Sequence, residues 1–89
     1  YAIHVLRADQ GDLAFKVVKN AGDFGDLDLI QGDHGAPIIP GCLAIFECQQ
    51  TNVYRAGDHD IILGEVKSLR TMEGDALGFF KGQMMTVTS

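Results

Sequence analysis

The sequence predicts a mainly β domain, an antiparallel β-barrel or half-barrel that carries one short helix. Several short segments rich in β-branched and aromatic residues are separated by glycine, aspartate and proline, which is the pattern of strands joined by turns. Only one stretch shows the helical spacing of apolar residues. The 89 residues suffice for one small domain with a modest core, and the short connections favour antiparallel strands.

The first two elements are a strand and the helix. Residues Tyr1 to Leu6 are apolar apart from His4, so we expect a strand that is largely buried on both faces. Asp9 is expected to cap the helix, with Asp12 in its first turn. We expect about three helical turns, held by docking of an apolar stripe rather than by intrinsic propensity. The stripe consists of Leu13, Ala14, Val17 and Val18.

A long connection follows the helix. Residues Asn20 to Gly41 are rich in glycine and aspartate and contain both prolines, which predicts a segment wrapped on the surface. Connections of this length in small domains are often functional. Residues 27–29 are expected to pair briefly as a strand. The side chains expected to anchor the connection are Phe24, Leu27, Leu29 and Ile30.

The remainder of the chain predicts two hairpins. Residues Cys42 to Val53 form a long strand whose first half is apolar on both faces and whose second half is polar, so one end is expected to be buried and the other solvated. The chain then turns at Gly57 and returns as a strand from Asp60 to Met72. A turn at 73–75 leads into the last two strands, at Ala76 to Lys81 and Met84 to Val87.

Composition limits the classes of partner. Seven basic residues against twelve acidic ones give a formal net charge of −5, which argues against a protein that binds nucleic-acid phosphates. The chain has no apolar run of membrane-spanning length, and its first residues have neither a basic leader nor a cleavage site. Cys42 and Cys48 are interpreted as reduced thiols in or near the core, which is typical of a cytoplasmic protein.

The stretch from Gly57 to Val66 is the main candidate for a site. Glycine allows unusual backbone angles, and an aspartate can stabilise the turn, so His59 is expected to project from a rigid edge at the start of a strand. An imidazole can donate, accept or offer a flat face at neutral pH. Two interpretations stay open from these residues alone: a binding loop on a β-barrel, or a hairpin connection with a solvated histidine.

The same stretch resembles the signature Gly-Asp-His-x-Ile-x-x-Gly-Glu-Val of the flavin reductase-like family. These proteins are FMN-binding split barrels that often serve as reductase components of two-component monooxygenases. Further segments are similar to the family's, in the same order along the chain. They are Ala2–Leu6, Phe24–Gly25, Gly32–Pro37, Gly41–Cys48 and Phe79–Gly82.

The resemblance implies an oxidoreductase that transfers a hydride from NAD(P)H to FMN or FAD and supplies reduced flavin to a monooxygenase. It implies that His59 orients the nicotinamide, that Gly57 and Asp58 shape its turn, and that Phe24 with Gly25 lies beside the flavin. Such transfer requires two rings stacked with water excluded, and thus a slot beside the imidazole. Phe24-Gly25-Asp26 is one small residue shorter than the family's pattern, and a plug over the core is the alternative role for Phe24.

A metal site is a different interpretation of the histidines. His4, His34 and His59 with nearby aspartates could supply the ligands of a catalytic zinc ion. However, no ligand pair has helical i, i+4 spacing and no Cys-x-x-Cys occurs, so we expect no metal. The cysteines lack a neighbouring cation or helix start, which argues against a thiol nucleophile.

The resemblance covers only the later half of the family's domain. Residues 1–89 are therefore interpreted as one domain that matches this half, and the strands that supply much of the flavin cradle would precede it. Three accounts stay open: a part of a larger protein, a barrel closed by a homodimer, or a shortened relative without flavin. The last account leads to the alternative function, a non-catalytic oligomerisation or binding module that retains the fold.

Overall fold

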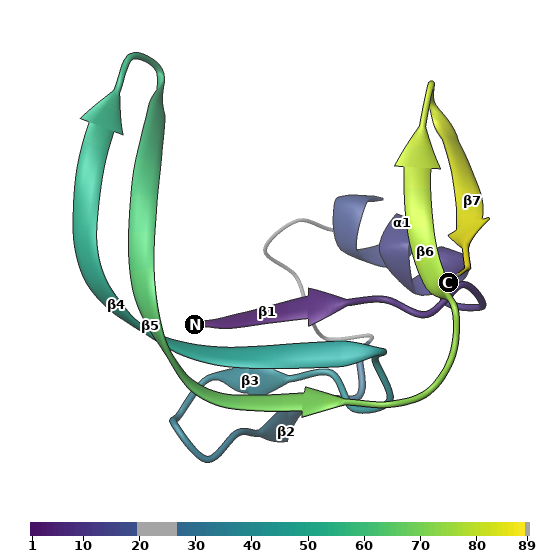
Figure 1. The fold of residues 1–89 in the computed structure, drawn as a ribbon, viewed down its shortest axis with the longest axis horizontal. Coiled ribbons are helices and arrows are strands. Elements are labelled where there is room, and N and C mark those ends of the chain that lie inside the picture. The colour runs from purple at the N-terminus through teal and green to yellow at the C-terminus, as the bar shows by residue number, and fades with distance from the viewer. Residues whose placement is uncertain (20–26, 89) are drawn as a thin grey trace.

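The computed structural model describes residues 1–19 and 27–88 and is built mainly from antiparallel strands (Figure 1). Within this part of the chain, the strands pair in three groups, with orders β1-β4-β5, β2-β3 and β6-β7. A mainly β, antiparallel architecture with one short helix is thereby confirmed. The element bounds are β1 (Ala2–Val5), α1 (Gly11–Lys19), β2 (Ile30–Gln31), β3 (Pro37–Ile38), β4 (Ala44–Ala56), β5 (His59–Thr71), β6 (Ala76–Phe80) and β7 (Gln83–Val87).

Strand β1 joins the two ends of the fold. Along residues 2–5 it pairs with β4. Beyond β1, the backbone of Leu6 accepts a hydrogen bond from Leu77 at 3.0 Å, and Ala8 donates one to Asp75 at 2.9 Å. Successive residues of a strand direct their backbone groups to alternate edges. The β6-β7 hairpin is therefore tied to the chain beyond β1 on the edge opposite β4.

A small core lies between the sheet and strand β3. It contains Ile38, Cys42 and Ile45, with Leu6 and Ile39 packed against them. Burial of this apolar surface is the main favourable contribution to folding here. The prediction that β1 is buried on both faces is wrong, because Ile3 is 50% exposed. The β2-β3 hairpin covers one face of the sheet, and Ile3 points to the other face, which the described residues leave open.

The helix begins later and packs less than predicted. Gly11–Lys19 spans nine residues, which is about two and a half turns. The carbonyl of Gln10 accepts the first helical hydrogen bond, from Ala14, so Gln10 occupies the position predicted for Asp9. The Asp9 carboxylate instead accepts a hydrogen bond from Arg7. Val18, predicted in the docking stripe, is 77% exposed.

The long connection forms a short hairpin. Ile30 pairs with Ile38 and Gln31 with Pro37, so the brief strand lies just after the predicted residues 27–29. Ile30 remains about half exposed and does not act as the predicted anchor on the core. The predicted anchor Phe24 and its neighbour Gly25 lie outside the described residues.

Strands β4 and β5 form one long hairpin that dominates the molecule. Figure 1 shows that it bends from the floor of the sheet into an upright half. The register shifts between Glu47 and Cys48 and between Gln50 and Asn52, and such bulges bend and twist a ribbon. As predicted, the first half of β4 is largely buried and the second half is exposed. The strand continues to Ala56, three residues beyond the predicted end.

The predicted properties of the cysteines and of the last hairpin are largely confirmed. Cys42 and Cys48 are both free and buried. Strand β6 ends at Phe80, and the tight turn that follows places Lys81 and Gly82 at positive φ, 51° and 77°. No helix in residues 1–19 or 27–88 combines the length and the apolar character needed to cross a membrane.

Candidate functional site

His59 lies at the tip of the β4-β5 hairpin, where the sequence predicted it. It is the first residue of β5 and pairs with Ala56 across a turn formed by Gly57 and Asp58. Gly57 has φ +65°, a conformation that glycine adopts without steric cost. The imidazole Nδ1 lies 2.5 Å from Asp58 Oδ1. This contact engages Nδ1 of the imidazole.

The imidazole projects into solvent rather than into a slot. The His59 side chain is 82% exposed and that of Asp58 is 92% exposed. The cavities described below lie at the inner end of the molecule, and His59 lines none of them. The described residues therefore do not enclose His59.

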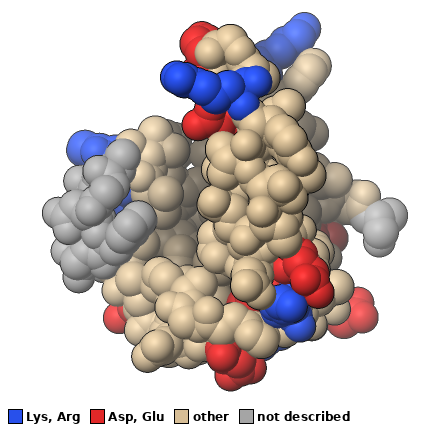
Figure 2. All heavy atoms as spheres, turned by 90° about the vertical axis from the view of Figure 1, so that its left-hand side faces the viewer, with Lys and Arg blue, Asp and Glu red and all other residues tan. Residues whose placement is uncertain are grey.

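The upright half of the hairpin is apolar on both faces. Residues two apart share a face of a strand, so Ile61 and Leu63 lie on the same face as His59, opposite Tyr54 and Asn52. The other face carries Val53 opposite Ile62. The apolar residues among these are each about half exposed. Figure 2 shows this half as a largely uncharged column with charged side chains gathered at its tip and its base.

Gly64, the glycine that interrupts the predicted strand, has a packing role. A Cβ atom placed on Gly64 would overlap the ring of Tyr1. Only a residue without a side chain allows this close approach of the ring to β5. Gly64 thus belongs to the packing at the bend, whereas the Gly-Asp-His part of the stretch forms the tip.

Sequence reasoning did not identify a buried carboxylate at the bend. Glu47 is 1% exposed. Its Oε2 accepts a hydrogen bond from Ser68 Oγ at 2.7 Å, its Oε1 accepts one from the backbone N–H of His34 at 3.4 Å, and Arg70 Nη2 lies 3.9 Å from Oε2. The Ser68 hydroxyl, the His34 amide and the Arg70 charge lower the pKa of Glu47 despite the opposing effect of burial. One acidic residue within an apolar run was the only signal in the sequence.

His4 and His34 have separate roles in this structure. The His4 Nε2 accepts a hydrogen bond from the backbone N–H of Ile39 at 3.0 Å, and burial lowers its pKa. Both Tyr1 and His4 line a cavity of about 350 Å³ beside the helix. His34 lines another cavity, next to Gln49. The described residues hold no cluster of three histidine, cysteine or acidic side chains that could ligate a metal ion.

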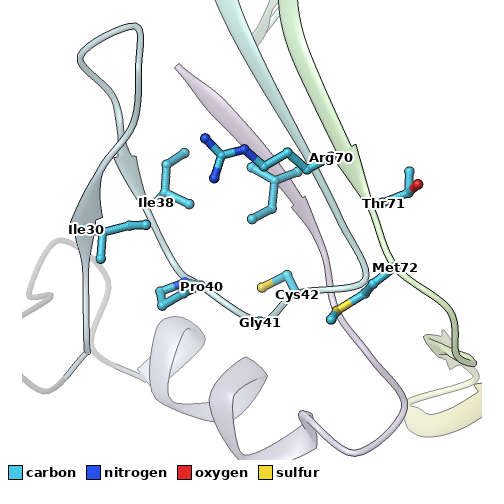
Figure 3. A pocket seen from close by; sticks show the side chains of 9 residues that line it. Ile30, Ile38, Pro40, Gly41, Cys42, Arg70, Thr71 and Met72 are labelled. Atoms are coloured by element: carbon cyan, nitrogen blue, oxygen red, sulfur yellow. The ribbon is translucent and has the colours of Figure 1, made fainter.

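The cavity at the core contains the thiol of Cys42. Figure 3 shows Arg70 of β5 extending towards Ile38. Cys42 and Met72 also line this cavity. Its volume is about 190 Å³. Burial raises the pKa of the Cys42 thiol, and Gln10 and Arg7 oppose this only in part. A protonated thiol is a poor nucleophile, so a catalytic role of Cys42 is not supported.

Comparison with known proteins places these features in a family. The family model described as flavin reductase like domain matches residues 1–88. The chain is 48% identical over 82 residues to FMN reductase (NADH) SmoA of Agrobacterium fabrum, covering 92% of this chain and 47% of that protein. It is 38% identical over 74 residues to actinorhodin polyketide dimerase of Streptomyces coelicolor, covering 82% of this chain and 42% of that protein. The chain thus spans less than half the length of these curated relatives.

Solved structures agree with the sequence relatives. The fold is similar to the flavin reductase PheA2 in its native state, with a TM-score of 0.86, 31% identity, and coverage of 100% of this chain and 57% of that chain. It is similar to the NADH:FAD oxidoreductase SgcE6 of Streptomyces globisporus C-1027, with a TM-score of 0.87, 31% identity, and coverage of 99% and 52%.

These likenesses confirm the predicted fold class, the split β-barrel of flavin reductases. The family model matches residues 1–88, which include the Gly-Asp-His tip and the glycine at the bend. The chain belongs to the flavin reductase-like family.

Proposed function

We propose that this chain forms the nicotinamide-facing part of a flavin reductase, which transfers a hydride from NAD(P)H to FMN or FAD. The observation that carries the proposal is the position of His59. It stands on a tight turn at the tip of a long ribbon, with Nδ1 engaged by Asp58 and the rest of the ring accessible. A residue that only has to orient a ring needs a fixed support and an open face.

The residues present fit flat heterocyclic rings. Flavin and nicotinamide have broad apolar faces, and the surface beside His59 offers the exposed apolar side chains of Tyr54, Ile61 and Leu63. When bound, the flavin supplies the hydride acceptor, at its N5 atom. His59 orients the nicotinamide, Gly57 and Asp58 hold the turn, and the neighbouring apolar side chains exclude water. Phe24 and Gly25 remain proposed flavin contacts.

The identity of the nucleotides is proposed from the relatives. One relative is named an FMN reductase (NADH) and a structural neighbour an NADH:FAD oxidoreductase. NADH is therefore our proposed hydride donor, and either FMN or FAD the acceptor. Other relatives are named reductase components or subunits of monooxygenases, so we propose a monooxygenase as the consumer of the reduced flavin.

The rest of the site is proposed to come from outside these residues. A two-stranded ribbon with apolar side chains on both faces is marginally stable in water. Residues 1–89 are accordingly proposed as the later half of a flavin reductase-like domain. We propose that the earlier strands cover one face of the upright hairpin and that a second copy, in a homodimer, covers the other.

The exposure of His59 favours one competing function, a binding module that keeps the fold without cofactor. Flavin binding distinguishes the two. Purified full-length protein is expected to be yellow, or to gain thermal stability when FMN or FAD is added, because a ligand that binds only the folded state stabilises it. Colourless protein whose melting temperature does not respond to either flavin would support the binding module.

The direct test of the proposed role is His59→Ala. NADH-dependent flavin reduction is expected to fall at least about tenfold, equivalent to about 1.4 kcal/mol of transition-state stabilisation. Asp60→Asn, which changes the next residue of the tip, also exposed, serves as the matched control and should retain activity. Unchanged turnover in His59→Ala would remove His59 from the mechanism.

A further inference from the structure

The β4-β5 hairpin connects the sheet to His59, so a small rotation at its base produces a larger displacement at its tip. From Cys48 to Ala56 the ribbon is about 26 Å long, at about 3.3 Å per residue. A change of about 5° at the base would therefore move the tip by about 2 Å. A displacement of about 1 Å can already cost about a hundredfold in rate. The geometry of the bend thus matters for any role of His59.

The buried Glu47 lies at the base of the outer half of this hairpin. The first register shift of the hairpin lies immediately after it, between Glu47 and Cys48. Its carboxylate joins three segments: its own strand β4, Ser68 of β5, and the backbone N–H of His34 in the β2-β3 loop. Strand register places Glu47 directly opposite Ser68. The carboxylate therefore fixes both strands and the loop beneath them at the point where the ribbon bends.

The Glu47 carboxylate is tightly packed. A Cβ atom on Gly32 would overlap Glu47 Oε1 and lie 2.9 Å from the Ile38 side chain, so the β2-β3 loop sits directly against the carboxylate. Burial of a charge is costly unless it is hydrogen-bonded and paired. Here Ser68, His34 and Arg70 supply those partners. Such directional contacts define a geometry more narrowly than apolar packing does.

We propose that Glu47, with Ser68 and the His34 amide, sets the bend of the β4-β5 hairpin and thereby positions His59 against the nicotinamide. Glu47 is a positioning residue, because it acts through the hairpin and touches no reacting atom. The inference rests on the proposed function for its effect on turnover. Its geometric part, control of the bend, stands independently of that function.

A double-mutant cycle tests the effect on turnover in the full-length protein. Glu47→Gln keeps the shape but removes the charge, and it is expected to raise the KM for NADH about tenfold. In the His59→Ala background the same change should alter KM less than about twofold, because its route to the substrate is already lost. Fully multiplicative effects, or a normal KM in Glu47→Gln, would overturn the proposal.

Two controls keep the cycle interpretable. Glu65→Gln makes the same chemical change in β5 at an exposed glutamate, which pairs with Lys67 at 3.2 Å, and it should leave KM unchanged. If Glu47→Gln does not fold, Ser68→Ala replaces it as the milder variant. Ser68→Thr, which restores a hydroxyl, should then rescue KM. Failure of this rescue would count against a hydrogen-bonded bend.

A readout without turnover separates this inference from the proposed function. One spin label is attached at Asp60→Cys, on the hairpin tip, and the other at Glu73→Cys, beyond the end of β5. Pulsed electron paramagnetic resonance then measures the distance between the tip and the inner end of the sheet. A broader distance distribution in Glu47→Gln than in the parent is expected. An unchanged distribution refutes control of the bend. If His59→Ala is fully active, only the proposed function of His59 fails, and the labels still decide about Glu47.

Discussion

The two halves of the β4-β5 hairpin differ in almost every physical respect. In the inner half, Ala44–Glu47 lie between β1 and β5 in a three-stranded sheet, and Ile45 packs against the core. In the outer half, only two strands pair, and their side chains are exposed on both faces. One face of the inner half packs on the core, whereas the outer half has exposed apolar side chains on both faces, among them Tyr54, Ile61 and Ile62.

This difference shows how one continuous element can serve two purposes. The apolar residues on one face of the inner half, such as Ile45, pack against Ile38 of β3 and stabilise the fold, whereas Leu69 on the other face is 53% exposed. The apolar residues of the outer half are about half exposed, and His59 lies at the far end of this surface. The bulges and Glu47 lie at the boundary. Substitutions in the two halves should therefore separate stability from function.

The largest expected effect is a loss of stability from the inner half. Ile45 is 6% exposed, whereas Ile61 in the outer half is 52% exposed. Ile45→Ala should lower the free energy of unfolding by about 2–4 kcal/mol, because it removes buried methyl groups and leaves a cavity.

Ile61→Ala is the matched change in the outer half, and urea titration of both variants measures the difference. In a monomeric protein Ile61→Ala should cost less than about 1 kcal/mol. A cost equal to that of Ile45→Ala would mean that the outer half is covered in solution. That result would contradict the difference in burial between the two halves and would support a dimer or additional strands over this face.

A smaller effect is expected where the two halves meet. Gly64→Ala places a Cβ atom against the hydroxyl and the ring edge of Tyr1, so it should destabilise the fold by about 1–3 kcal/mol through overpacking. Gly11→Ala is the control, because nothing lies within 4 Å of a Cβ atom in the first turn of the helix. That change should be neutral or stabilising by up to about 1 kcal/mol. Thermal unfolding measures both, and equal effects would contradict the packing assigned to Gly64.

The sequence predicted local structure well where one pattern dominated. Alternating and continuous apolar runs identified the long hairpin, and Gly57 identified its turn, because these signals are local. The same holds for the tip position of His59. The resemblance to the flavin reductase-like family started from this stretch, was supported by further segments along the chain, and was confirmed over residues 1–88.

Features that depend on contacts between distant residues were missed. Burial of Glu47 requires Ser68 and the His34 amide, which lie 21 and 13 residues away, and no local pattern encodes that meeting. The predicted burial of β1 on both faces failed for a similar reason. An apolar sequence shows that a face can be covered, but it does not show which segment covers it. The predicted docking of Val18 failed for the same reason, and this side chain is exposed.

The smallest expected effect is a pH dependence at His4 of β1, the strand that pairs with the inner half. The pKa of His4 is lowered from 6.5 by burial, and its Nε2 must be unprotonated to accept the hydrogen bond from Ile39. The unfolded chain therefore takes up the proton first as the pH falls below 6.5. The stabilisation is fully present above pH 6.5 and declines as the pH falls towards the lower folded pKa.

Replacement of His4 with glutamine tests this prediction. A glutamine carbonyl has about the reach of the imidazole Nε2 and can accept the hydrogen bond from Ile39, but it does not titrate, so His4→Gln should flatten the dependence of unfolding free energy on pH below 6.5. Urea titrations of both proteins at several pH values measure the slope. Glu47, whose pKa is lowered from 4.5, loses its contribution only at more acidic pH, so the two windows are separable. An equally steep slope in His4→Gln would assign the titration to another group.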